Sequence, residues 1–391
     1  MKQPQRKYVV GVIAIFMGIV SLPCCVEPFT PHVKKYSDLL VVDGTLTDEP
    51  GSQVVTVSRT SDYSEAEFLP ENGCVVTILD DQGNIYPFNG KGDGKYVAEF
   101  YQGDLKYGRA YMLRVIAGSG DVYESDYQVL KPAPPIDSVT ARYETKVTAE
   151  NTRGLKGYQF FVNTSDPTNN TRYYRWSAEE TWEYHAPYEV VFMWDGTLHF
   201  FSFPDNRSTC WKTSDIPAIY TATTRDMSED RLTNVKLSFV STGSERLKWR
   251  YSLLVTEYSL SAESYEFWNG LEKQTQKTGG LYEAQPYMIE GNISCVSTPD
   301  EVVLGFFCVS GVSKKRIFVG PAPDPVYEMV CNLDKIGPRN PIEDYPESAY
   351  PVYLTGTLLP GGGYAMAASE RRCFDCLERG GTNVKPDFWE D

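Results

Sequence analysis

From residue 39 to residue 130 the chain is divided into short runs in which apolar and polar residues alternate. Alternation with a period of two puts every second side chain on one face, as in a β-strand that is buried on one side. Compact turn sequences separate the runs, such as Asp81-Gln82-Gly83-Asn84 and Gly92-Asp93-Gly94-Lys95. The pattern predicts an immunoglobulin-like or prealbumin-like β-sandwich. Its runs are residues 39–46, 52–60, 74–81, 84–88, 94–100, 109–117 and 122–130.

A second and less regular series of alternating runs follows, and it predicts a larger β-rich domain. One segment, residues 261–275, has helical spacing instead, because Tyr265, Trp268 and Leu271 recur every three residues. Ser261 is a suitable N-cap for this helix. The fold class is therefore mainly β with one short helix. The alternating runs are residues 136–144, 157–166, 172–184, 234–242, 249–260 and 301–320.

The two series are separated by the segment Lys131-Pro132-Ala133-Pro134-Pro135. Prolines stiffen such a connection, and they cannot donate the hydrogen bonds of a continuous strand ladder. We therefore place the domain boundary near residue 132. This gives an N-terminal β-sandwich domain, residues 37–132, and a C-terminal β-rich domain with a cysteine-containing tail, residues 133–391.

The N-terminal segment has the pattern of an export signal. Lys2, Arg6 and Lys7 precede an apolar segment, residues 9–20, that is too short to span a bilayer comfortably, and the sequence then reaches Cys24 and Cys25. We predict a lipoprotein signal peptide at residues 1–24, cleaved before Cys25, and a lipidated tether at residues 25–36. Acyl chains such as palmitate on Cys25 would then hold the protein on a membrane. An ordinary signal peptide with incidental cysteines is the alternative.

Charge narrows the range of partners. The formal net charge of the full chain is −15, and loss of the three basic residues in 1–24 brings it to −18. Such a chain repels nucleic acid and anionic lipid surfaces, so we expect no nucleic-acid partner. Attachment to a lipid bilayer must come from the acyl chains. The hydrophobic content of 41% is sufficient for substantial cores.

An odd number of cysteines remains after Cys25, and the exported location permits disulfides. Cys74 and Cys308 lie within apolar runs and are predicted to be buried small hydrophobic residues. For Cys373-Phe374-Asp375-Cys376, metal binding and redox activity are the alternatives to a structural role, but the sequence offers neither an adjacent second cysteine pair nor a thioredoxin-like context. The candidates for structural disulfides are Cys210, Cys295, Cys331, Cys373 and Cys376.

Five aromatic residues gather in one stretch of the second domain: Trp176, Trp182, Tyr184, Tyr188 and Trp194. They have two interpretations. Exposed, they would form a platform for a glycan, for another nutrient or for a partner protein. Buried, they would be cross-strand packing residues of a β-sheet, and this is the interpretation that we favour.

Catalytic patterns are lacking. The chain has no Gly-x-Ser-x-Gly sequence, no His-Glu-x-x-His sequence and no glycine-rich phosphate loop before a helix, and its three histidines are isolated from one another. We therefore predict no catalytic residues, no metal site and no cofactor, and we expect a binding protein rather than an enzyme.

Five segments occur in a characteristic order: residues 25–29 (CVEPF), 40–44 (LVVDG), 251–261 (YSLLVTEYSLS), 290–293 (EGNI) and the tail from Cys373 to Trp389. Together they resemble a known group, the Bacteroidota outer-membrane lipoproteins catalogued as domain of unknown function 4249. The tail is the most specific of them, and the resemblance runs over essentially the whole mature chain.

This resemblance implies a lipid-anchored outer-membrane protein encoded beside a TonB-dependent receptor. The expected function is that of an accessory or lid-like subunit for nutrient uptake; the alternative is a stand-alone surface protein that binds a glycan or nutrient. Surface export in these bacteria is usually linked to an acidic run after the lipidated cysteine, and here only Glu27 is acidic. The sequence therefore leaves open the cell surface and the periplasmic face.

Overall fold

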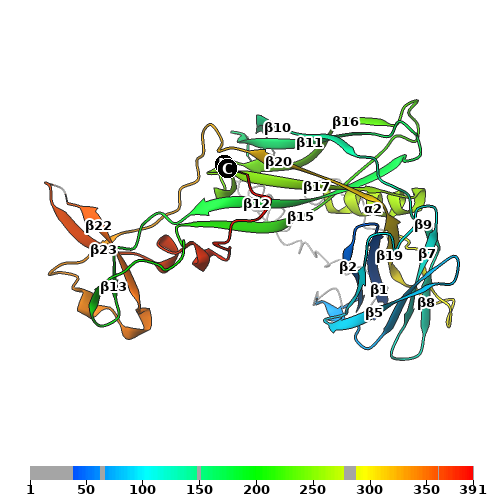
Figure 1. The fold of residues 1–391 in the computed structure, drawn as a ribbon, viewed down its shortest axis with the longest axis horizontal. Coiled ribbons are helices and arrows are strands. Elements are labelled where there is room, and N and C mark those ends of the chain that lie inside the picture. Colours follow the sequence, from blue (N-terminus) through cyan, green and yellow to red (C-terminus); the bar gives the residue numbers. More distant parts are fainter. Residues whose placement is uncertain (1–37, 62–66, 148–150, 277–287, 360, 391) are drawn as a thin grey trace, which may run out of the picture.

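A computed structural model describes residues 38–61, 67–147, 151–276, 288–359 and 361–390. These residues form an elongated molecule with an N-terminal sandwich at one end, a large sandwich in the middle and a smaller sheet at the other end (Figure 1). We call the smaller sheet and the short segments packed on it the distal lobe. Cys25 and the predicted signal peptide lie outside the described residues. Among the residues described, none belongs to a helix with the length and apolar character needed to cross a membrane.

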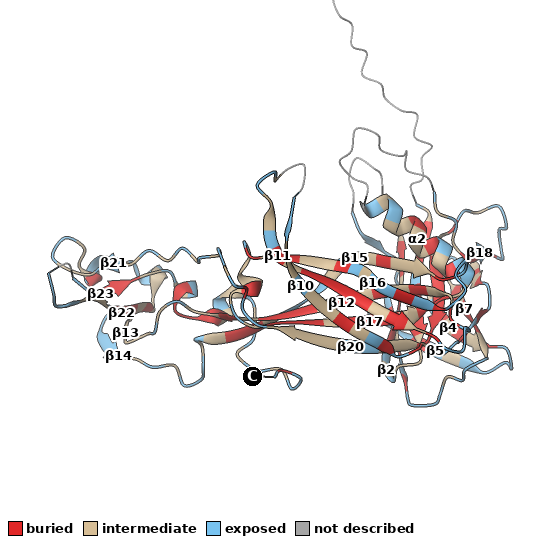
Figure 2. Ribbon diagram, turned by 90° about the horizontal axis from the view of Figure 1, so that it is seen from above, coloured by how far each residue is buried: buried red, intermediate tan, exposed pale blue. Residues whose placement is uncertain are grey.

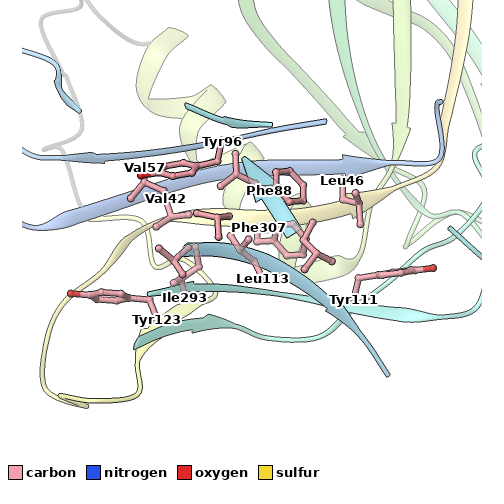
Figure 3. Close-up of a cluster of buried hydrophobic side chains, with 14 of the residues drawn as sticks. Val42, Leu46, Val57, Phe88, Tyr96, Tyr111, Leu113, Tyr123, Ile293 and Phe307 are labelled. Atoms are coloured by element: carbon pink, nitrogen blue, oxygen red, sulfur yellow. The ribbon is translucent and has the colours of Figure 1, made fainter. Parts of the chain in front are cut away.

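The N-terminal sandwich is built from one long sheet in the order β18-β8-β7-β4-β5-β6-β2-β1-β19. Strand β5 pairs with β4 along its first half and with β6 along its second half, so the sheet folds over and encloses a core. Tyr111, Tyr123 and Phe307 are fully buried in this core (Figure 3). The strands are β1 (Leu40–Thr47), β2 (Gly51–Arg59), β3 (Leu69–Pro70), β4 (Val75–Asp80), β5 (Ile85–Gly92), β6 (Lys95–Phe100), β7 (Ala110–Ile116), β8 (Val122–Ser125), β9 (Gln128–Val129), β18 (Ile293–Cys295) and β19 (Leu304–Ser310).

Each of the seven predicted N-terminal runs contains a strand, but the sandwich also takes two strands from far along the chain. Strand β19 pairs in parallel with β1, and β18 pairs with β8. Their side chains Ile293 and Phe307 belong to the same core as the N-terminal strands. A boundary at residue 132 therefore leaves out part of the N-terminal sandwich, because pairing across such a sequence distance has no local signal.

The large sandwich packs two sheets against each other, one in the order β10-β11-β16 and one in the order β15-β12-β17-β20. The sequence did not predict β15, which pairs with β12 through a bulge at the level of Pro217. Proline and the bulge break the alternation, and both are tolerated because β15 is an edge strand. The strands are β10 (Ile136–Lys146), β11 (Leu155–Ser165), β12 (Tyr173–His185), β15 (Thr209–Thr223), β16 (Arg231–Ser241), β17 (Tyr251–Ser259) and β20 (Val312–Val319).

Helix α2 (Ala262–Gln276) is the only α-helix in the described part of the chain, and it matches the predicted segment. The Ser261 hydroxyl accepts a hydrogen bond from the amide of Ser264 at 3.0 Å, so Ser261 is the N-cap. The helix packs on β15 and β12, and its Phe267 stacks on Phe306 of β19 at 4.8 Å. It therefore bridges the two sandwiches (Figure 2).

A joint between the sandwiches forms where the proline-rich segment meets the β19–β20 connection. The predicted run 301–320 divides here at Gly311, whose amide donates to the carbonyl of Lys131 at 2.9 Å. A Cβ at Gly311 would lie 2.3 Å from that carbonyl oxygen, so only glycine fits. On the other side of the joint, the amide of Val312 donates to a carboxylate oxygen of Asp48.

The distal lobe is a sheet in the order β14-β13-β22-β23-β21 with a small core around Val352 and Leu354. The chain enters and leaves it through residues 186–191, 201–208, 320–333 and 369–372, which we call the neck. Its strands are short and were not predicted. They are β13 (Phe192–Trp194), β14 (Leu198–Phe200), β21 (Asp334–Lys335), β22 (Val352–Leu358) and β23 (Tyr364–Ala368). The described residues also form the 3-10 turns Glu245–Leu247 (η1), Ile342–Asp344 (η2), Glu347–Ala349 (η3), Arg371–Cys373 (η4) and Cys376–Arg379 (η5).

Candidate functional site

The distal lobe lies at the end of the molecule away from the N-terminal sandwich (Figures 1 and 2). It exposes large apolar side chains. Phe200 is 85% exposed, Tyr364 80% and Leu358 66%. Leu198 is exposed as well. We call Leu198, Phe200, Leu358 and Tyr364 the apolar face.

The strand register places these four residues on one side of the sheet. Leu358 pairs with Tyr364, and Phe192 pairs both with Phe200 and with Leu354. Directly paired residues point to the same side, and so do residues two apart in a strand. The apolar face is therefore on the same side of the sheet as the buried Leu354. The core side chains cover Leu354 but do not cover the four residues of the apolar face.

Sequence reasoning missed this face, although a signal for part of it was present. Asp195-Gly196 lies between the apolar residues of β13 and β14, and an Asp-Gly pair in that position is a strong hairpin signal. Gly196 has a φ of 106°, a value that side chains rarely allow. The glycines at 361–363 lie between Leu358 and Tyr364, which are paired strand residues.

Two disulfides fasten the neck and the tail. Cys331 is bonded to Cys373, and Cys210 is bonded to Cys376. Both cysteines of the Cys-x-x-Cys sequence are thus used in structural bonds to different segments, which confirms the structural interpretation. Between them, Asp375 is buried and receives a hydrogen bond from Nη1 of Arg207 at 2.9 Å. These bonds fix the distal lobe relative to the large sandwich.

Aromatic packing holds the same region together. The ring of Tyr353 on β22 contacts Phe201, Phe203 and Phe374, with centroids 5.3 to 6.2 Å apart. Tyr188 packs on Phe374, and its hydroxyl donates to the carbonyl of Cys331 at 3.0 Å. Edge-to-face and stacked rings of this kind add to the stability that burial supplies.

The proposal of Cys295 as a disulfide candidate was wrong. Cys295 is 2% exposed in the core of the N-terminal sandwich, opposite Tyr123 of β8, whereas the four bonded cysteines lie in β15, in the neck and in η4 and η5. The three cysteines that are free in the described structure are Cys74, which is only partly buried, and the buried Cys295 and Cys308. Burial in an apolar core makes Cys308 a small hydrophobic residue, as predicted.

The five aromatic residues singled out in the sequence do not form one platform. Trp176, Trp182 and Tyr184 point into the core of the large sandwich and are buried. Tyr188 lies in the neck, and Trp194 packs in the distal lobe, where its Nε1 donates to the hydroxyl of Tyr350 at 3.2 Å. The interpretation of this stretch as an exposed ligand surface was therefore wrong, because alternate residues of β12 face the opposing sheet.

A buried carboxyl group lies beneath these aromatic residues. Glu257 on β17 accepts hydrogen bonds from Nε1 of Trp176 at 2.8 Å and from the hydroxyl of Thr164 at 3.0 Å. Its side chain is fully buried, and loss of hydration raises the pKa of Glu257 to about 8. Glu257 is thus a core residue of the large sandwich. Across the described ranges, no three His, Cys, Asp or Glu side chains are grouped closely enough to hold a metal ion.

The family model described as Domain of unknown function (DUF4249) matches residues 26–316. This match covers both sandwiches as far as β20 and stops before the second half of the distal lobe and the cysteine-containing tail. The tail, which was the most specific part of the resemblance in the sequence, is thus outside the matched region. No curated protein matches the chain. With about three quarters of its length matched, the chain belongs to the DUF4249 family.

Proposed function

We propose that this protein is a lipid-anchored outer-membrane accessory protein that docks on a TonB-dependent β-barrel transporter during nutrient uptake. Acyl chains on Cys25 attach it to the bilayer, and the N-terminal sandwich acts as a spacer. The apolar face of the distal lobe contacts the transporter. The proposed anchor precedes β1, and Figure 1 draws β1 at the opposite end of the long axis from the distal lobe.

The observation that carries the proposal is the uncovered sheet side at Leu198, Phe200, Leu358 and Tyr364. Large apolar side chains exposed at one end of a domain indicate a site of protein or membrane contact, and aromatic residues are enriched in the centres of protein interfaces. The net charge of −15 disfavours an anionic lipid surface as the partner. A protein partner is therefore the better match for this face.

The neck supports the same function. Two disulfides and the cluster around Tyr353 hold the distal lobe in one orientation. A rigid, pre-oriented surface loses less entropy on binding than a mobile one. The lobe therefore presents its apolar face to a partner without first having to be ordered.

The test is purification of the tagged protein from its own host in mild detergent, followed by mass spectrometry of what accompanies it. We expect a TonB-dependent barrel with the wild type. The double variant Phe200→Ser, Tyr364→Ser is expected to recover at least tenfold less of it, because two exposed aromatic anchors are lost. The matched control is Phe68→Ser, Tyr101→Ser, which removes two exposed aromatic residues from the N-terminal sandwich and leaves recovery unchanged.

Cys25→Ser serves as the second arm and should move the protein from the membrane fraction to the soluble fraction. Purification of the wild type alone under several growth conditions would refute the docking proposal. Equal recovery of the barrel with both double variants would refute the assignment of the apolar face.

A further inference from the structure

A cleft of about 340 Å³ opens beside the neck, at the end of the large sandwich where β12 finishes. Segments far apart in the sequence line it: Tyr184 and His185 at the end of β12, Lys248 and Trp249 after η1, Tyr327 in the neck and Arg379 in η5. This volume is near the lower end of the range of roughly 300–1,000 Å³ that small-molecule sites occupy. The cleft is separate from the apolar face of the distal lobe.

An aromatic stack forms one wall of the cleft. The rings of His185 and Trp249 lie 3.9 Å apart between centroids, with an angle of 22° between their planes. Trp249 is 39% exposed, although Trp176 and Trp182 of the same sandwich are buried. Glu183 pairs with His185 at 2.6 Å and fixes the position of the imidazole. An exposed ring that is held in place offers a stacking surface for the ring of a ligand.

A fixed ion pair forms the floor. The guanidinium of Arg379 lies 4.3 Å from the centre of the Tyr184 ring, and its Nη1 donates to the carbonyl of His185 at 3.0 Å. It also forms an ion pair with Glu245, and both side chains are largely buried. Desolvation by this burial lowers the pKa of Arg379. The charges of Arg379 and Glu245 thus compensate each other inside the protein.

Lys248 is different, because it lines the cleft and its ammonium group has no ion pair or hydrogen bond to any described residue. The hydroxyl of Tyr327 is likewise without a hydrogen-bond partner among the residues described. A carboxylate is the ligand group that an ammonium and a hydroxyl can both bind by donating hydrogen bonds.

We propose that this cleft binds a small carboxylic acid that contains a ring. The ring extends the stack of His185 and Trp249, and the carboxylate accepts hydrogen bonds from Lys248 and Tyr327. Aromatic acids and acidic sugars share this chemistry, since both offer a flat apolar face and one negative charge. The site goes beyond docking on a transporter, because it gives the protein a ligand of its own at residues that the apolar face does not include.

The experiment is calorimetric titration of the purified protein with two acids and their neutral counterparts. The acids are 4-hydroxybenzoate and D-glucuronate; the neutral probes are 4-hydroxybenzyl alcohol and D-glucose. We expect one acid to bind at least tenfold more tightly than its neutral counterpart, and the acid that does so identifies the source of the ligand. If both acids bind no better than the neutral probes, the proposal is wrong.

Variants of Lys248 and Trp249 test separately the contribution of the ammonium charge and that of the aromatic ring to binding. Lys248→Gln should reduce the preference for the acid to about threefold or less, and Lys248→Arg should retain it, because arginine keeps the charge. Trp249→Ala should weaken the binding of that acid at least tenfold, and thermal unfolding checks that the variant is folded. Undiminished preference in Lys248→Gln would overturn the proposal even if Trp249→Ala failed to fold. None of these residues belongs to the apolar face, so failure here leaves the docking proposal testable by its own variants.

Discussion

The carboxyl group of Glu257 illustrates how single residues are tuned in the large sandwich. Hydrogen bonds from Trp176 and Thr164 favour its charged form, but desolvation outweighs them, and the nearby Asp137 and Asp230 add repulsion. With a pKa of about 8, the group is mostly protonated at neutral pH in the folded protein. In the unfolded chain the same group has the ordinary value of 4.5 and is ionised.

This difference predicts a pH dependence of stability. Because the folded pKa is raised, the contribution of Glu257 is fully present below pH 4.5 and is lost as pH rises to 8. Glu257→Gln cannot ionise, so the free energy of unfolding of the wild type relative to this variant should fall by about 3 kcal/mol between pH 5 and pH 8. Urea unfolding at both pH values measures this. Parallel pH profiles for the two proteins would contradict the prediction.

At the scale of elements, the segment before β18 shows how a distant strand is held in the N-terminal sandwich. The side-chain amide of Asn292 donates to the carbonyl of Phe307 and accepts from its amide, both at 2.8 Å. The side-chain amide thereby satisfies the two backbone groups of Phe307 that a neighbouring strand would bind at the outer edge of β19. A Cβ at Gly291 would lie 1.8 Å from the carbonyl oxygen of Gly305, so the close approach requires glycine. These contacts explain the sequence Glu290-Gly291-Asn292-Ile293.

Asn292→Ala should therefore destabilise the protein by about 2–4 kcal/mol, because it leaves two backbone groups of Phe307 without partners. Asn292 is 9% exposed, so water does not replace the lost bonds fully. The control is Ser294→Ala on the exposed side of β18, which should change stability by less than about 0.5 kcal/mol. Denaturant unfolding that found the two variants equally stable would rule out this role of Asn292.

At the scale of the whole molecule, the N-terminal sandwich depends on chain that follows most of the large sandwich. Strands β18 and β19 and their connection contribute Ile293, Cys295, Val303, Phe307 and Val309 to its core. Each fully buried apolar side chain contributes about 1.5–3 kcal/mol. Together they supply on the order of 10 kcal/mol, which is comparable to the net stability of a typical domain.

A fragment of residues 37–132 should therefore fail to fold, although it contains every predicted strand of the first series. Joining residues 288–312 to its end through a flexible linker should restore folding, because β18 and β19 complete the sheet. Circular dichroism and the dispersion of amide resonances distinguish the two states. Cooperative unfolding of the short fragment by itself would show that the distant strands are dispensable.

Much of this architecture is local in origin and was predicted. The seven strands predicted for the N-terminal sandwich follow from alternation, α2 follows from its spacing and its Ser261 cap, and four of the five candidate cysteines form disulfides. The apolar face was not predicted, since β13 and β14 are each too short to show a period. Nor was the cleft, because His185, Trp249 and Arg379 are neighbours only after β12, η1 and η5 converge.

The sequence by itself determined which residues share a face in each predicted strand and in the helix, because backbone geometry imposes those periods on neighbouring residues. It did not determine which face would be covered. Only the tertiary structure decided that Trp176 and Tyr184 are buried, that Cys210 pairs with Cys376 rather than with Cys295, and that β19 lies beside β1. Those outcomes depend on contacts between residues far apart in the chain, and such contacts produce no periodic pattern of apolar and polar residues in the sequence.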